Sequence, residues 1–149
     1  MKKEKYPSNE KTRQILQDNL KSIREILNWT SADLGNLIGV TKQTISNLET
    51  KNSKLTKLHY IAIQTVVDFE IEKLKSTDSD RAERACMLLE VLSKAEEENL
   101  DFDEISQASK LIVSSTSAAI AGTIIGALIP FVVNRFNKKI DNIELYPKS

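Results

Sequence analysis

The residues with the most specific chemistry lie in one stretch, NWTSADLGNLIGVTKQTISNLE, at positions 28–49. Gly39 separates two short helical patterns and tolerates the positive φ of a tight turn, while Gly35 lets the two helices touch. The second helix is expected to begin at Thr41 and to end near Glu49. Apolar side chains anchor both helices at Leu34, Ile38, Val40 and Ile45. The second helix would then present polar, hydrogen-bonding side chains outward, as a helix in the major groove of DNA requires.

The flanking sequence supplies the helices that must position this pair. Leu16, Leu20, Ile23 and Leu27 follow a helical period over about 12–27. Thr30 or Ser31 can cap the helix that Gly39 ends. A fourth helix has the inner residues Leu55, Leu58, Ile61, Ala62 and Thr65, and residues 66–71 belong either to its end or to a fifth helix. With only four Gly and three Pro in 149 residues, the chain is predicted to be all-α.

The stretch and its flanks resemble the lambda-repressor-like, or Xre-type, helix-turn-helix family over about residues 12–71. Besides the motif at 28–49, the segment IREIL contains an arginine, Arg24, that matches the family's first helix, and LTKLHYIA is similar to its fourth helix. The resemblance implies a helical DNA-binding bundle in which Arg24 and Glu49 form a structural ion pair. Three positions differ from the family pattern: Ser31 replaces a common Gln, Lys51 a Gly and Leu55 a Pro.

Carried over by position, the resemblance also implies the DNA-contacting residues. The outward residues of the recognition helix are Lys42, Gln43, Thr44 and Asn47. Gln and Asn can pair with adenine, and Lys can donate to guanine or phosphate. Phosphate contacts are expected from Thr30, Ser31, Thr41 and Lys51, with Lys54 and Lys57 extending them.

Charge and composition agree with a nucleic-acid partner and argue against catalysis. Residues 1–66 carry eleven Lys or Arg against six Asp or Glu, whereas residues 67–149 carry ten against fifteen. A basic front half suits a polyanion. Cys86 is the sole cysteine and His59 the sole histidine, and the chain lacks a Gly-rich phosphate loop and a nucleophile–histidine pairing. We expect no enzyme activity, no metal and no cofactor.

The second half is predicted to be helical and to end in an apolar segment. Residues 76–80 form a hinge and cap, a helix follows over about 80–98, and another starts near Asp101 and runs into LIVSSTSAAIAGTIIGALIPFVV at 111–133. No charged residue lies between Lys110 and Arg135, a length that could cross a bilayer. If the DNA-binding end lies in the cytoplasm, the basic residues beyond the segment would lie outside the cell. The positive-inside rule favours the opposite orientation. The alternative is a helix buried in a dimer core.

The predicted organisation has five parts: a polar arm at 1–11, the helix-turn-helix domain at 12–75, a helical linker or oligomerisation region at 76–110, an apolar helix at 111–134 and a polar tail at 135–149. The expected function is a homodimeric, sequence-specific regulator of transcription that binds double-stranded DNA in the cytoplasm, as a repressor by default. It is either tethered to the membrane through 111–133 or wholly soluble. A third hypothesis is a membrane or protein-interaction factor that keeps the helical frame without reading DNA.

Overall fold

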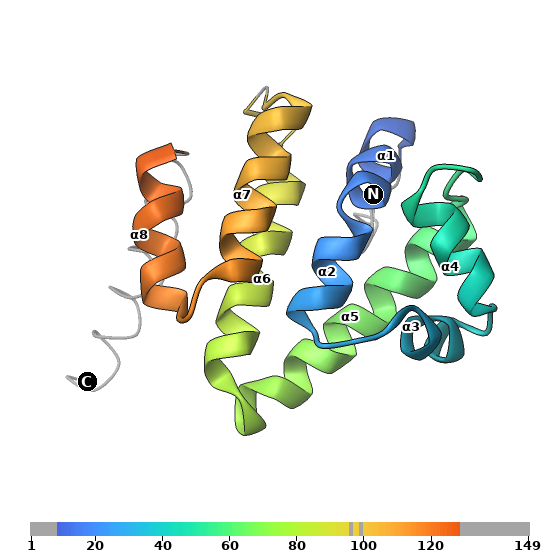
Figure 1. Cartoon of the computed structure of the whole chain (residues 1–149), viewed down its shortest axis with the longest axis horizontal. Coiled ribbons are helices and arrows are strands. Elements are labelled where there is room, and N and C mark those ends of the chain that lie inside the picture. Colours follow the sequence, from blue (N-terminus) through green and yellow to red (C-terminus); the bar gives the residue numbers. More distant parts are fainter. Residues whose placement is uncertain (1–8, 96, 99, 129–149) are drawn as a thin grey trace, which may run out of the picture.

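A computed structural model describes residues 9–95, 97–98 and 100–128, and every regular element in that part of the chain is a helix. The helices are α1 (Glu10–Asp18), α2 (Leu20–Ile26), α3 (Ser31–Ile38), α4 (Lys42–Glu49), α5 (Lys57–Thr77), α6 (Ser79–Lys94), α7 (Phe102–Ser114) and α8 (Ala118–Leu128). The predicted all-α class is thus confirmed. Figure 1 shows α3 and α4 at one end of the molecule and α8 at the opposite end.

Side-chain caps set the beginnings of the short helices as the sequence predicted. Thr30 Oγ1 accepts from the backbone N–H of Asp33 at the start of α3, and Thr41 Oγ1 accepts from that of Thr44 at the start of α4. Gly39 ends α3 with φ +78°, in the left-handed region that glycine adopts without strain. The turn between α3 and α4 therefore has the predicted glycine with positive φ and the predicted threonine cap on the helix that follows.

The helix expected over 12–27 is divided into α1 and α2. Asn19 interrupts it with φ −114° and ψ 11°, outside the helical region. The Asn19 side chain donates from Nδ2 to the carbonyl of Ile15 and accepts at Oδ1 from Ser109 Oγ of α7, each at 2.8 Å. Asn competes with the helical backbone through such bonds, and its partner lies 90 residues away, so the periodicity of the segment could not reveal the break. By contrast, α5 continues through residues 66–71 without a fifth helix at that point.

The contact between α3 and α4 requires a residue without a side chain. A Cβ at Gly35 would lie 2.7 Å from the backbone carbonyl oxygen of Val40. Ile45 and Leu48 are fully buried on the inner side of α4. Gly35 thus permits the close approach that seats α4, as the sequence predicted.

Two polar clamps hold the end of α4. The Arg24 guanidinium donates from Nε to Glu49 Oε1 at 2.7 Å and from Nη2 to Oε2 at 3.3 Å, and its Nη1 donates to the carbonyl of Trp29 at 2.9 Å. The ion pair expected from the resemblance is therefore present. Buried Gln17, which the sequence analysis did not identify, donates to the carbonyls of Leu48 and Ser53 and accepts from the N–H of Leu55. Together these bonds join α1 and α2 to the end of α4 and the loop that follows it.

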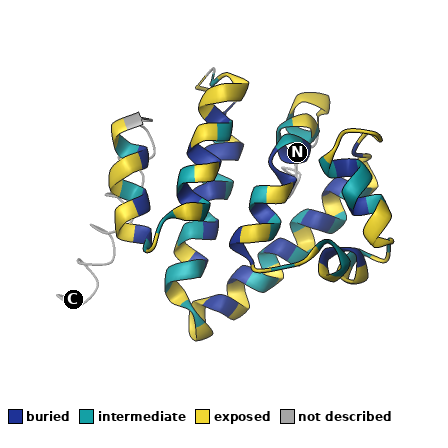
Figure 2. Ribbon diagram, viewed as in Figure 1, coloured by how far each residue is buried: buried dark blue, intermediate teal, exposed yellow. Residues whose placement is uncertain are grey.

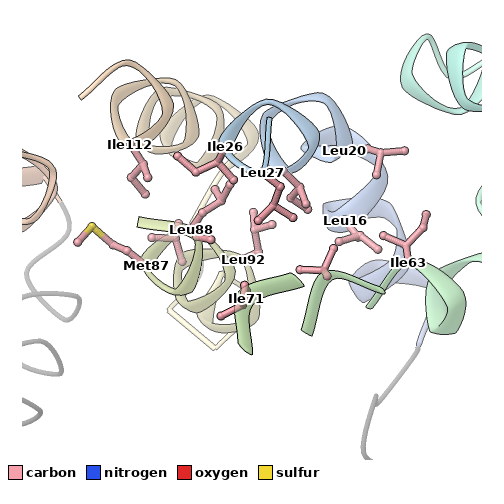
Figure 3. Packing of buried hydrophobic residues seen from close by; sticks show 14 of the residues in the cluster. Leu16, Leu20, Ile26, Leu27, Ile63, Ile71, Met87, Leu88, Leu92 and Ile112 are labelled. Atoms are coloured by element: carbon pink, nitrogen blue, oxygen red, sulfur yellow. The ribbon is translucent and has the colours of Figure 1, made fainter. Parts of the chain in front are cut away.

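The helices after the hinge pack on the same core as the first five. Leu88 and Val91 of α6 and Ile112 of α7 are fully buried. Figure 3 shows Leu88 and Leu92 of α6 beside Ile26 of α2 and Leu27, which directly follows that helix. The region 76–110, expected as a linker or oligomerisation region, thus packs in the described structure against the helix-turn-helix domain. Its role in pairing two copies stays a prediction.

The apolar segment is not one helix in its described part. Residues 111–114 end α7 and residues 118–128 form α8, with Ser115 extended between them. Ser115 Oγ donates to the carbonyl of Leu111, and Ser117 Oγ accepts from the N–H of Ile120. The Ser115 hydroxyl thus adds a bond to the carbonyl that its own backbone N–H already reaches at the end of α7, and the Ser117 hydroxyl accepts from an N–H at the beginning of α8. Asp80 Oδ1 also accepts from the N–H of Ala118 at 2.8 Å. Residues 129–134 of the expected helix lie outside the described residues.

Within the described ranges, no helix combines the length and the apolar character that crossing a bilayer would need.

We expect Gly35→Ala to destabilise the protein by about 1–3 kcal/mol, because the new methyl group would press on a backbone oxygen that cannot move without separating α3 from α4. Urea denaturation followed by far-ultraviolet circular dichroism would measure the free energy of unfolding. Asn36→Ala, at the next and exposed position of the same helix, is the control and should change it by no more than about 0.5 kcal/mol. Equal stability of the two variants would contradict the close contact.

Arg24→Ala should lower the free energy of unfolding by about 2–4 kcal/mol, because it leaves the Glu49 carboxylate nearly buried without its cation. The two side chains are only 14% and 12% exposed. Lys21→Ala provides the control, since Lys21 and Glu25 form an exposed pair at 3.9 Å and should contribute less than about 1 kcal/mol. The free energy of unfolding is again measured by urea denaturation. If both variants lost a similar amount, the Arg24–Glu49 pair would contribute no more to stability than an exposed ion pair.

Candidate nucleic-acid interface

The outer face of α4 combines amide and hydroxyl groups on a helix whose inner face is apolar. Lys42 and Gln43 are exposed, and Thr44 and Asn47 are half-buried. Figure 2 shows exposed, intermediate and buried positions along the ribbon of α4. Gln43 Nε2 donates to Asn47 Oδ1 at 3.0 Å, so the two amides lie side by side one turn apart. Gln43 keeps its carbonyl oxygen and one N–H for another partner, and Asn47 keeps its NH₂ group. This arrangement can read a base edge that offers both a donor and an acceptor.

Threonine side chains cap the beginnings of α3 and α4. Thr30 and Asp33 form a reciprocal capping box, in which the N–H of Thr30 donates to Asp33 Oδ2 and lowers the pKa of that carboxyl. Thr41 caps α4, and its hydroxyl also lies 2.9 Å from the Thr44 hydroxyl. The helix dipole and the N–H groups at the beginning of α4 favour negative charge and suit a phosphate, whereas at the beginning of α3 the Asp33 carboxylate already accepts from the N–H of Thr30. Ser31, the first residue of α3, is half-buried at that position.

Lys51 is placed differently from the other predicted contacts. It adopts φ +63°, the left-handed conformation that explains why the family usually has Gly there. Its Nζ lies 2.8 Å from Asp18 Oδ1 and 4.9 Å from the centre of the Phe102 ring of α7. To contact a phosphate, Lys51 would have to exchange these partners.

The two further lysines extend the basic character of this end of the chain. Lys54 pairs with Glu10 of α1, and this hydrogen bond and the lysine charge lower the pKa of the Glu10 carboxyl. Lys57 is exposed at the start of α5. Both lysines could attract DNA electrostatically, but a contact from Lys54 to DNA would compete with its ion pair to Glu10.

The structure thus brings seven of the predicted contact residues onto one pair of adjacent helices and their caps: Thr30, Ser31, Thr41, Lys42, Gln43, Thr44 and Asn47. Arg24 of α2 supports α4 through its ion pair with Glu49, the last residue of that helix. Gln17 is the positioning residue that sequence reasoning missed. A polar residue at an otherwise inward position of the first helix was the available signal.

In the comparison with protein families, residues 20–74 match the model described as Helix-turn-helix. That range covers α2 to α5 nearly whole and leaves α1 outside, whereas the resemblance seen in the sequence extended over about 12–71. Neither the comparison with curated proteins nor the one with solved structures finds a significant match to the chain. Residues 20–74 are therefore a helix-turn-helix domain of the lambda-repressor-like (Xre-type) family, which is a family of DNA-binding transcription regulators.

Proposed function

We propose that this protein regulates transcription by inserting α4 into the major groove of a specific DNA sequence. The observation that carries the proposal is the exposed amide pair of Gln43 and Asn47, on a helix fastened to the bundle by Gly35, Gln17 and the Arg24–Glu49 pair. A side chain reads a base reliably only when its helix is held rigidly. The role is binding, with no catalytic step.

The proposed contacts divide into two classes. Gln43 and Asn47 face base edges, with adenine as the preferred partner, while Lys42 and Thr44 contact a guanine, a thymine methyl group or the backbone nearby. The beginning of α4, at Thr41, holds a phosphate through its backbone N–H groups, while Thr30 and Ser31 contact phosphate through their hydroxyl groups. The first class would give specificity and the second the orientation of the domain.

Repression by occupying a promoter is the default form of this regulation. One module with a single recognition helix of eight residues contacts few base pairs, so we propose that two copies bind adjacent half-sites. The membrane tether is not part of the proposal, since Ile112, Ala121 and Ile125 of the apolar segment are buried in the protein's own core. The segment's described part already has a partner there.

The proposal is tested by selecting binding sites from a pool of random DNA duplexes with the full chain. We expect an enriched sequence, and we expect Gln43→Ala and Asn47→Ala each to weaken binding to it by about tenfold to a hundredfold, the value of a bidentate base contact. Gel shifts at one stated salt concentration would measure the Kd.

Gln107→Ala is the matched control, because it removes an exposed amide on α7, at a distance from α4 in the chain and on another helix. It should leave the Kd unchanged. If the pool yields no enriched sequence, or if all three variants bind as the wild type does, specific readout through α4 is excluded. In that case the helical frame serves another interaction.

A further inference from the structure

Lys51 occupies a backbone position that favours glycine. It follows the end of α4 with φ +63°, where its N–H donates to the carbonyl of Leu48 at 3.3 Å and the N–H of Asn52 donates to the carbonyl of Asn47 at 2.9 Å. These two bonds form a Schellman motif, whose left-handed residue is usually Gly because a Cβ is strained there. A lysine at this position therefore has to be compensated by contacts of its side chain.

The first of these contacts is with Asp18, the last residue of α1. Lys51 Nζ lies 2.8 Å from Asp18 Oδ1, and the Asp18 side chain is only 12% exposed. Helix α1 has no basic residue in its last turn, so this carboxylate lies at the negative end of the helix dipole without a cation from its own helix. Its Oδ1 is buried and has no hydrogen bond among the described residues. The charge of Lys51 thus compensates a carboxylate that has lost most of its hydration.

The second contact comes from α7. The ring of Phe102, the first residue of that helix, has its centre 4.9 Å from Lys51 Nζ, which is a cation–π distance. Two turns further on, buried Ser109 donates at 2.8 Å to Asn19, the residue that follows Asp18. Helix α7 packs beside α2 (Figure 1). The position of α7 therefore determines whether the ring lies over the lysine.

From this arrangement, and on the basis of the proposed function, we propose that α7 keeps Lys51 away from DNA. With Phe102 in place, the lysine is held on Asp18 and makes no contact with phosphate. When the beginning of α7 moves away, Lys51 is released and adds one phosphate contact beyond the C-terminal end of α4. Asp18 and Phe102 both lie outside the matched range 20–74, so this restraint comes from the flanking helices α1 and α7.

Lys54, on the same loop, shows how a lysine without such a restraint is placed. It pairs with Glu10 at the other end of α1, but the two side chains are 74% and 67% exposed. An exposed ion pair contributes little and exchanges readily with another partner, such as a phosphate. The pair at Lys51 differs because its carboxylate is nearly buried and a ring lies against its cation. Of these two lysines, Lys51 is the one whose contact with DNA is restrained.

The first test measures how the Kd for the selected DNA duplex depends on salt, because the slope of log Kd against log salt concentration counts phosphate contacts. Asp18→Asn should steepen this slope by about 0.9, the value of one phosphate contact. Phe102→Ala should tighten binding at low salt by about two- to fivefold, as expected for loss of an exposed cation–π contact, and should steepen the slope in the same direction. Phe102→Ala changes no charge, so its effect cannot come from the net charge.

Two matched controls and one second substitution isolate the effect. Glu10→Gln removes the same charge from α1 at an exposed pair, and Ile120→Ala removes an exposed apolar side chain from α8. Both should keep the wild-type slope. Lys51→Gly suits the left-handed backbone. It should leave the wild-type slope unchanged and cancel the gain of Asp18→Asn and of Phe102→Ala. Equal circular dichroism spectra would verify that every variant is folded.

The second test needs no DNA. Limited acetylation of the full chain with an N-hydroxysuccinimide ester, followed by mass spectrometry of peptides, compares Lys51 with the exposed Lys21 as an internal reference. Because its partners shield the ammonium group, Lys51 should be acetylated at least twofold more slowly in the wild type than in Phe102→Ala or Asp18→Asn. The Ile120→Ala variant should react as the wild type does.

The proposal and the function on which it rests fail in different ways. A wild-type slope that Lys51→Gly already lowers by about 0.9 would show that the lysine contacts DNA with α7 in place, and would overturn the restraint. A gain from Phe102→Ala that persists with Lys51→Gly, or a Phe102→Ala variant with wild-type acetylation and wild-type slope, would overturn it as well. If Phe102→Ala exposes Lys51 to the reagent but no variant binds any duplex, the contact with α7 is confirmed and the proposed function is rejected.

Discussion

The close approach of α3 and α4 at Gly35 is the constraint on which the rest of the structure depends. A single methyl group at this position would lie 2.7 Å from the Val40 carbonyl oxygen, so the two helices meet at backbone distance. That contact brings α3 and α4 close together, and Gly39, with φ +78°, lets the chain turn sharply between them. Burial of Ile45 and Leu48 on one side of α4 then leaves its polar side chains on the other.

Hydrogen bonds and an ion pair hold the C-terminal end of α4 in place, whereas the close contact at Gly35 holds its N-terminal end. Arg24 bridges Glu49 and the carbonyl of Trp29, and Gln17 bridges the carbonyls of Leu48 and Ser53. Such nearly buried groups need their partners, because an unpaired charge or amide in this position loses its hydration without compensation. Helix α4 is thus held at both ends, as the proposed reading of bases by Gln43 and Asn47 requires.

The helices beyond the matched domain are joined to it by more than apolar packing. Ser109 of α7 donates to Asn19 at the break between α1 and α2, and Phe102 at the start of α7 lies against Lys51. A shift of α7 would therefore disturb both the hydrogen bond to Asn19 in the core and the contact with Lys51, which lies near the proposed DNA surface. The C-terminal helices extend the bundle that carries the proposed DNA-binding surface.

Much of the domain followed from local chemistry: the caps at Thr30 and Thr41, the turn at Gly39, the small residue at Gly35 and the apolar anchors depend on residues within a few positions of one another. Family resemblance added the Arg24–Glu49 pair. Only the tertiary structure decided the break at Asn19, the bridging by Gln17, the partners of Lys51 and the division of the apolar segment at 115–117. In each of these cases a polar side chain bonds to backbone or to a residue up to 90 positions away. Helical periodicity reports which face of a segment is buried, and it carries no information about such distant partners.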